Sequence, residues 1–156
     1  MENMSAEERL RELKIDLGDG QRPLGAYAEA VQTGNLLFLT GMLPIRHGKA
    51  SFVGRLGKEF DGDQGREATR LAALNVLATA RQHLGSLDKV TRIVRLTVFL
   101  ATAGDFFEQP RVADAASELF RDIFGPERMS VRSVIGVASL PLGMPVELEA
   151  TLEVGA

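Results

Sequence analysis

The run Val146-Glu-Leu-Glu-Ala-Thr-Leu-Glu-Val154 alternates apolar and polar side chains over its whole length. Successive side chains of a β-strand point to opposite faces, so the pattern predicts a strand over Pro145–Val154 with one face on a core and the glutamates facing outward. A second strand is predicted over Ser130–Ala138, and the turn Leu140-Pro-Leu-Gly-Met144 joins the two. The C-terminal end of the chain therefore predicts two strands of a sheet with one covered face.

Two helices are predicted upstream of these strands. One begins at Asp61 or Asp63, whose side chains can cap a helix, and runs to Leu84. The other begins near Pro110, which suits a first helical turn because proline has no N–H to satisfy, and ends at the Gly-Pro pair 125–126. Apolar residues recur in both at three- and four-residue steps, so each helix is expected to pack along one side.

Shorter runs predict the other strands. Tyr27–Gln32 and Leu36–Thr40 flank a Thr-Gly-Asn turn and predict a hairpin, and a further short strand is predicted around Phe52. Residues 89–100 lie between the two helices, and their alternation places four apolar side chains on one face: Val94, Leu96, Val98 and Leu100. The resulting order, ββ(β)αβαββ, predicts an α+β fold with two helices packed on one face of a sheet. The other face still carries apolar residues, so we expect another subunit to cover it.

The N-terminal segment 1–22 is predicted to be a helical extension of this domain. Ser5 followed by Glu8 has the form of a capping box, and the turn Gly18-Asp-Gly20 is expected to end the helix. Residues 1–13 are charged rather than apolar, which is unlike a signal peptide, and no apolar run approaches the ~20 residues of a membrane helix. We therefore expect a single cytoplasmic domain over residues 1–156 with no membrane partner.

Composition excludes several classes of function. The chain has no cysteine, so disulfides, thiolate metal sites and thiol nucleophiles are excluded. Its net charge of −3 argues against nucleic acid as the main partner, because such a partner requires a basic surface. The two histidines, His47 and His83, lack the spacing of metal ligands, and capping explains the pair Asp61 and Asp63. No metal site is predicted.

Two charged residues stand out near the C-terminus. Arg132 lies in a strand-like run with apolar residues on both sides, where it either forms a surface ion pair or binds an anion through its planar fork of N–H groups. Glu147 is one of three glutamates on the polar face of the last strand, which is typical of a solvated surface. It is also the one nearest the turn, where a carboxylate can position or deprotonate a water molecule.

Several short motifs run through most of the chain from Leu24 to Val154. They are Gly25-Ala-Tyr27, Gly34-Asn-Leu-Leu-Phe-Leu-Thr-Gly-Met-Leu-Pro44, Val98-Phe-Leu100, Arg132-Ser133, Leu140-Pro141 and Val146-Glu-Leu-Glu-Ala150. Taken together they resemble the RidA (YjgF) family of reactive-imine deaminases. The resemblance implies a chorismate-mutase-like α+β fold with a mixed sheet, assembled as a homotrimer with clefts between subunits. It also implies hydrolysis of 2-imino and 2-enamino acids to 2-oxo acids and ammonia, without a metal or organic cofactor.

The resemblance assigns roles to individual residues. Arg132 matches the arginine that grips the substrate carboxylate, and Glu147 matches the glutamate that helps to place the attacking water. Four further positions match residues around the substrate: Tyr27, Thr40, Asp114 and the backbone of Val134. Asp114 stands where the family commonly has asparagine, and Met42 where it usually has glutamine, so the chain resembles a divergent branch.

Three functions are therefore compared. The first is imine and enamine hydrolysis. The second is a non-catalytic module that binds small carboxylate metabolites, which the carboxylate of Asp114 and the departure at Met42 favour. The third is RNA cleavage, because members of the family have carried an endoribonuclease label. The net charge, the absence of a catalytic histidine pair and the single tyrosine argue against this third function.

Overall fold

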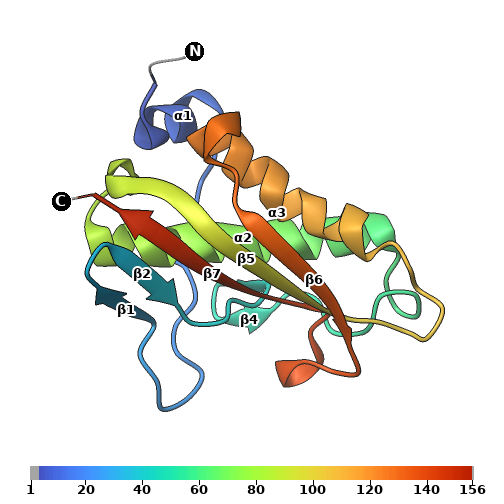
Figure 1. The fold of residues 1–156 in the computed structure, drawn as a ribbon. Helices are drawn as coiled ribbons and strands as arrows, with labels where there is room; N and C mark the ends of the chain where they lie inside the picture. Colours follow the sequence, from blue (N-terminus) through green and yellow to red (C-terminus); the bar gives the residue numbers. More distant parts are fainter. Residues whose placement is uncertain (1–3, 156) are drawn as a thin grey trace.

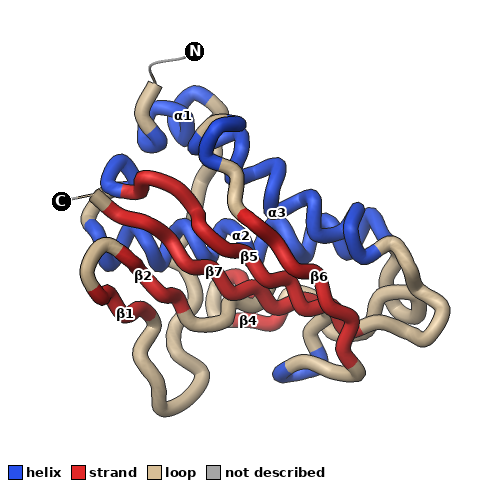
Figure 2. The backbone as a smooth tube through the Cα atoms, viewed as in Figure 1, coloured by secondary structure: helices blue, strands red, loops and turns tan. Residues whose placement is uncertain are grey.

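A central sheet of five strands organises the computed structural model, which describes residues 4–155 (Figure 1, Figure 2). Its order is β1–β2–β7–β5–β6, with β1 and β6 at the edges. The strands are β1 (Ala30–Thr33), β2 (Leu36–Leu39), β5 (Val90–Ala101), β6 (Val131–Val137) and β7 (Val146–Val154). Neighbouring strands pair antiparallel except β5 and β6, which are parallel, so the sheet is mixed.

Two long helices, α2 (Gly62–Leu84) and α3 (Gln109–Phe124), pack on one face of this sheet, as predicted (Figure 1). A third helix, α1 (Ala6–Glu12), lies against α3. Asp61 caps α2 by accepting a hydrogen bond from the N–H of Gln64 at 2.8 Å. The smaller elements are β3 (Ile45–Arg46), β4 (Lys49–Ala50) and three 3-10 turns, η1 (Leu87–Lys89), η2 (Pro126–Arg128) and η3 (Pro141–Gly143).

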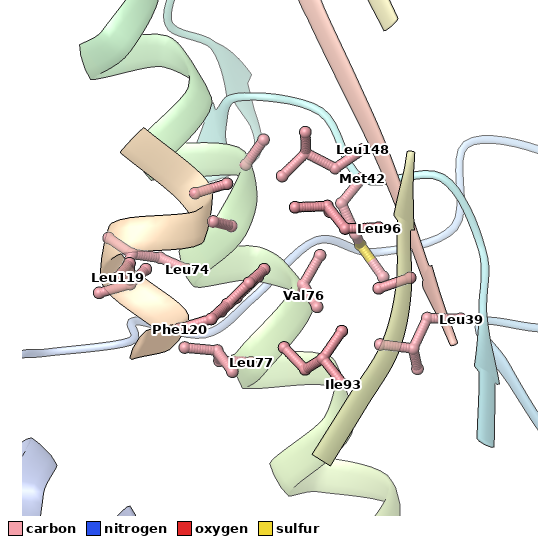
Figure 3. Close-up of a cluster of buried hydrophobic side chains, with 14 of the residues drawn as sticks. Leu39, Met42, Leu74, Val76, Leu77, Ile93, Leu96, Leu119, Phe120 and Leu148 are labelled. Atoms are coloured by element: carbon pink, nitrogen blue, oxygen red, sulfur yellow. The ribbon is translucent and has the colours of Figure 1, made fainter. Parts of the chain in front are cut away.

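The core lies between the sheet and α2 and α3 (Figure 3). The apolar residues of β7 all face it, as the alternation predicted: Val146, Leu148, Ala150, Leu152 and Val154. Small buried residues on α2, among them Ala72 and Ala80, let this helix approach the sheet closely. In the part of the chain from 4 to 155, no helix has the length and apolar character needed to cross a bilayer.

The prediction for β5 was wrong at one position. Ile93, rather than Val94, is buried in the core, while Val94 is only partly buried. The pairing of β5 with β7 shifts register between Ile93 and Arg95, which is a β-bulge. An extra residue in one strand reverses the face of the side chains beyond it, so strict alternation could not hold along the whole strand.

Two other local predictions were also wrong. The N-terminal helix ends at Glu12, before the glycine turn, and Leu13 beyond it is 46% exposed rather than part of an apolar stripe. No strand forms around Phe52. The short strands β3 and β4 lie earlier and flank a tight turn at His47-Gly48, where both residues have positive φ as two-residue hairpins require.

Candidate functional site

The arginine singled out from the sequence, Arg132, lies near the start of the edge strand β6. Its Cα pairs in register with Leu96 of β5, so its side chain points to the helix-covered face of the sheet. There Nη1 of Arg132 donates hydrogen bonds to Oδ1 of Asp114 at 2.7 Å and to Oγ of Ser117 at 3.2 Å, both on α3. The structure therefore brings together two predicted site residues, Arg132 and Asp114, and adds Ser117.

These bonds occupy only one side of the guanidinium group. Within residues 4–155, no group accepts a hydrogen bond from Nε or Nη2 of Arg132. The side chain is 25% exposed, so its other edge is reachable from outside. Nε and Nη2 carry two parallel N–H bonds, the arrangement that binds a carboxylate through both of its oxygens.

Asp114 supplies the counter-charge. Its side chain is 48% exposed, and ion pairs with one partner in solvent contribute at most about 1 kcal/mol to stability. The pair therefore orients Arg132 more than it stabilises the fold. It also places a negative charge beside the edge that would receive an anionic ligand.

Glu147 lies on the opposite face of the same sheet. Its register partner on β5 is Phe99, which in turn pairs with Ile135 on β6, and these side chains share the face that no helix covers. Burial raises the pKa of Glu147, and the neighbouring carboxylate of Glu149 raises this pKa further. Among the described residues no cation forms a salt bridge with Glu147.

The carboxylate of Glu147 rests on the backbone of Gly41. A Cβ placed on Gly41 would overlap Oε1 of Glu147 and lie 2.9 Å from its Cδ. Gly41 does not have the positive φ that would itself demand glycine. The glycine is therefore needed because of the space that its missing side chain leaves for Glu147.

Two buried amides hold the segment Gly41–Ile45. Oε1 of Gln21 accepts a hydrogen bond from the N–H of Leu43 at 2.7 Å, and Nε2 of Gln21 donates to the carbonyl of Gly41 at 3.4 Å. Asn75 donates to the carbonyls of Leu43 and Ile45 at 2.8 and 2.9 Å. This segment has β7 on one side, through Met42 and Leu148, so the two side chains replace a missing strand on its other side.

The other predicted site residues are spread over the sheet. Tyr27 lies in the loop before β1, where its hydroxyl oxygen accepts a hydrogen bond from the N–H of Leu24 at 2.8 Å. Thr40 directly follows β2 and precedes Gly41, so it lies on the Glu147 side of the molecule. Val134 lies on β6, two residues from Arg132, and packs against the core. Within one chain, Tyr27 and Arg132 therefore lie at opposite edges of the sheet.

Met42 does not lie in a ligand site. Its side chain is fully buried in the core (Figure 3), and the hydroxyl of Thr79 donates a weak hydrogen bond to its sulfur at 3.9 Å. Methionine at this position therefore bears on core packing, and it no longer favours one function over another.

Residues 7–148 match the family described as "YjgF/chorismate_mutase-like, putative endoribonuclease". The chain belongs to this YjgF/RidA family. The matched region includes most of the N-terminal segment that was predicted to be an extension.

Two curated members of the family and one solved structure illustrate the similarity. Protein TCP17 of Trypanosoma cruzi is 37% identical over 92% of this chain and 91% of its own length. A 2-iminobutanoate/2-iminopropanoate deaminase of Dermatophagoides farinae is 29% identical over 83% of this chain and 86% of its own length. The crystal structure of a protein from Shewanella oneidensis, named there a "putative endoribonuclease", superimposes with a TM-score of 0.92 at 29% identity, covering 97% of this chain and 100% of that one.

Three residues around this candidate site were missed from the sequence: Ser117, Gln21 and Asn75. Asn75 left a signal, since it is an amide on the buried side of a helix lined mostly with alanine, leucine and valine. Gln21 and Ser117 left none, because glutamine in a loop and serine on a helix are typical of solvated positions. No group of three or more His, Asp or Glu side chains suited to a metal occurs between residues 4 and 155.

Proposed function

We propose that the protein hydrolyses 2-imino and 2-enamino acids to 2-oxo acids and ammonia, in clefts between the subunits of a homotrimer. The observation that carries the proposal is the guanidinium of Arg132, braced through Nη1 and left with Nε and Nη2 for a carboxylate. Membership of the family and a relative named as a 2-iminobutanoate/2-iminopropanoate deaminase support the choice of substrate.

In the proposed reaction Arg132 holds the substrate carboxylate and Glu147 handles the protons. The Glu147 carboxylate accepts a proton from water as the water oxygen bonds to the carbon of the protonated imine, giving a tetrahedral amino alcohol. Glu147 then returns that proton to the amine nitrogen. As the C–N bond breaks, Glu147 takes the hydroxyl proton while the C=O bond forms, and this proton leaves with the ammonia as ammonium together with the 2-oxo acid. An enamine first takes a proton on carbon to become the imine. The raised pKa of Glu147 suits a group that both accepts and returns a proton near neutral pH.

The position of the two residues favours a shared site. Arg132 and Glu147 lie on opposite faces of one sheet, so they cannot both reach a small molecule within one chain. The face of Glu147 also carries exposed apolar side chains at both edges of the sheet, Val31 and Phe38 on β1 and β2 and Val131 on β6, with Thr151 and Arg95 in register between them. In a closed assembly this face would meet the β6 edge of a neighbour, and Arg132 of one subunit would join Glu147 of the next.

A second candidate is a non-catalytic module that binds small carboxylates. The carboxylate of Asp114 beside Arg132 speaks against a standard 2-imino acid as substrate, because it repels a second anion, and this departure keeps the binding module as the alternative. One measurement distinguishes the two functions: the rate at which 2-oxo acid forms when an imino acid is generated in the sample. A deaminase raises this rate above that in buffer alone, and a binding module does not.

Complementation between inactive variants tests the proposal. Arg132→Ala and Glu147→Gln are each expected to be inactive in imine hydrolysis. Suppose that each site takes Arg132 from one subunit and Glu147 from another. Random assembly of equal amounts of the two variants then restores about a quarter of the wild-type activity. Half of the sites receive an intact Arg132, and, independently, half of those receive an intact Glu147.

Two results would count against the proposal. Mixed assemblies with no activity would mean that both residues act within one subunit, or that one of them is not in the site. Wild-type protein that fails to accelerate release of the 2-oxo acid would leave the binding module as the better reading.

A further inference from the structure

The N-terminal segment from Lys14 to Arg22 follows an unusual course. After α1 it crosses α2 to the other side of this helix before the chain enters β1 (Figure 1). Gly20 lies against this helix, where an added Cβ would be 3.2 Å from the Cβ of Ala78, and its φ of +75° favours glycine. We call residues 14–22 the strap.

Besides the buried side chain of Leu17, side-chain hydrogen bonds within residues 4–155 attach the strap at two places, and these differ in what they touch. Gln82 of α2 donates from Nε2 to the carbonyl of Asp19 at 2.9 Å, in an exposed position. Gln21 is 5% exposed and bonds through both its oxygen and its nitrogen to the segment Gly41–Leu43. Only the second attachment reaches backbone that contacts the candidate site.

The contact between that backbone and Glu147 is close. The carboxylate of Glu147 occupies the space above Gly41, and Met42 is tied to β7 beside Glu147 by two hydrogen bonds with Leu148, at 2.7 and 2.8 Å. Gln21 therefore forms its hydrogen bonds on the side of this segment that faces away from β7. Without it, the N–H of Leu43 would lose a buried partner and the segment could move relative to the carboxylate.

We infer that Gln21 is a positioning residue for the proposed reaction, which fixes Gly41–Leu43 so that the carboxylate of Glu147 keeps its place and its partial shelter from water. The strap then helps to set the geometry of the site through Gln21. The kinetic part of this inference rests on the proposed function, but the effect on the surroundings of Glu147 does not.

The shelter of Glu147 provides a readout that does not need turnover. Its pKa is raised first by burial and then by Glu149, the charged neighbour on its own strand. Its register partners across the sheet, Phe99 and Ile135, carry no charge, and neither does the segment 40–43. A looser segment would admit water to the carboxylate, so its pKa would fall towards the ordinary value for glutamate.

The experiment compares Gln21→Met with Gln82→Met in the full-length protein. Methionine keeps the length of glutamine but makes neither hydrogen bond. The carboxyl of Glu147 is titrated by NMR on protein labelled with ¹³C in its glutamates, assigned by its loss in Glu147→Gln. Steady-state rates of imine hydrolysis and melting temperatures are measured on the same samples.

For Gln21→Met we expect a lower Glu147 pKa and a kcat reduced by about tenfold to a hundredfold, with KM nearly unchanged because Arg132 is not disturbed. Gln82→Met should change neither. A Gln21→Met protein that melts earlier yet titrates and turns over like wild type would show that Gln21 is only structural, and equal changes in both variants would show a general loosening of the strap; either overturns the inference. If wild type shows no turnover, the proposed function fails, and the NMR titration still decides the role of Gln21.

Discussion

Arg132 and Glu147 are carried by one sheet, but their surroundings are opposite in kind. Arg132 has its counter-charge in place, with Asp114 at 2.7 Å and Ser117 bonded to the same nitrogen. Glu147 has no cation partner within residues 4–155, and its one charged neighbour, Glu149, carries the same sign. The guanidinium of Arg132 is therefore oriented by oppositely charged and polar partners. Ionisation of the Glu147 carboxyl, by contrast, costs free energy because the group is partly buried and has no counter-ion.

This difference separates binding from proton transfer. A group that binds an anion works best when it is always charged and already oriented, as Arg132 is. A group that exchanges protons works best when its two protonation states are close in free energy, and partial burial without a counter-ion brings the carboxylate of Glu147 towards that condition. Substitutions in the two regions test whether Arg132 serves anion binding and Glu147 serves proton transfer.

The largest effect is expected at Glu147. Glu147→Gln should lower the rate of imine hydrolysis by about 10²–10⁴-fold while affinity for a 2-oxo acid stays close to that of wild type, because the amide cannot accept the proton. Glu149→Gln is the matched control on the same face of β7 and should change the rate little. Equal losses in both would mean that the glutamates act only as a charged surface.

The next effect is expected at Arg132. Arg132→Ala should weaken binding of a small 2-oxo acid by roughly tenfold to over a hundredfold, since a charge-assisted contact is worth about 1.5–3 kcal/mol. Arg132→Lys keeps the charge without the planar fork and should fall between alanine and wild type. Calorimetric titration measures the affinities, and a melting curve checks the fold. A well-folded Arg132→Ala with unchanged affinity would remove Arg132 from the site.

A smaller effect of opposite sign is expected at Asp114. Asp114→Asn keeps an acceptor for Nη1 of Arg132 but removes a negative charge beside the ligand, so affinity for a monoanionic 2-oxo acid should rise by up to about fivefold, in line with the ≤ 1 kcal/mol of exposed charge pairs. The same titration measures it, at low and at high salt. Weaker binding by this variant would indicate that Asp114 contacts a positive part of the ligand.

The smallest effect concerns stability and pH. Because burial raises the pKa of Glu147 in the folded state, its ionisation opposes folding above that pKa and has no effect below the unfolded value, roughly pH 4. Glu147→Gln should therefore raise the melting temperature slightly at neutral pH, and the gain should vanish near pH 4 and below. A gain that is independent of pH would mean that packing, rather than charge, is responsible.

The sequence predicted the regular parts of this molecule well because their signals are local. The alternation in β7, the cap at Asp61 and the helical spacing of α3 each depend on neighbours in the chain. The bulge in β5 was not predictable, because apolar residues at both 93 and 94 permit either face and only the pairing with β7 decides between them.

The charged residues of the candidate site could be predicted from the sequence, but the residues that position them could not. Arg132 and Asp114 were named from the sequence, and the structure brings them together. Gln21 lies 22 residues from its partner Leu43, and no local pattern marks such a contact. The opposite faces of Arg132 and Glu147 follow from strand register, which connects residues far apart in the chain.

The overlap that any side chain at Gly41 would make with Glu147 also constrains how such sequences diverge. A lineage that replaces Gly41 by alanine displaces the carboxylate without altering a single reactive group, since the far end of Glu147 can swing aside while the fold is kept. A glutamate at position 147 is therefore an insufficient marker of a working site in a related sequence. The pair, glycine at 41 together with glutamate at 147, is the one to look for, and the two positions should change together.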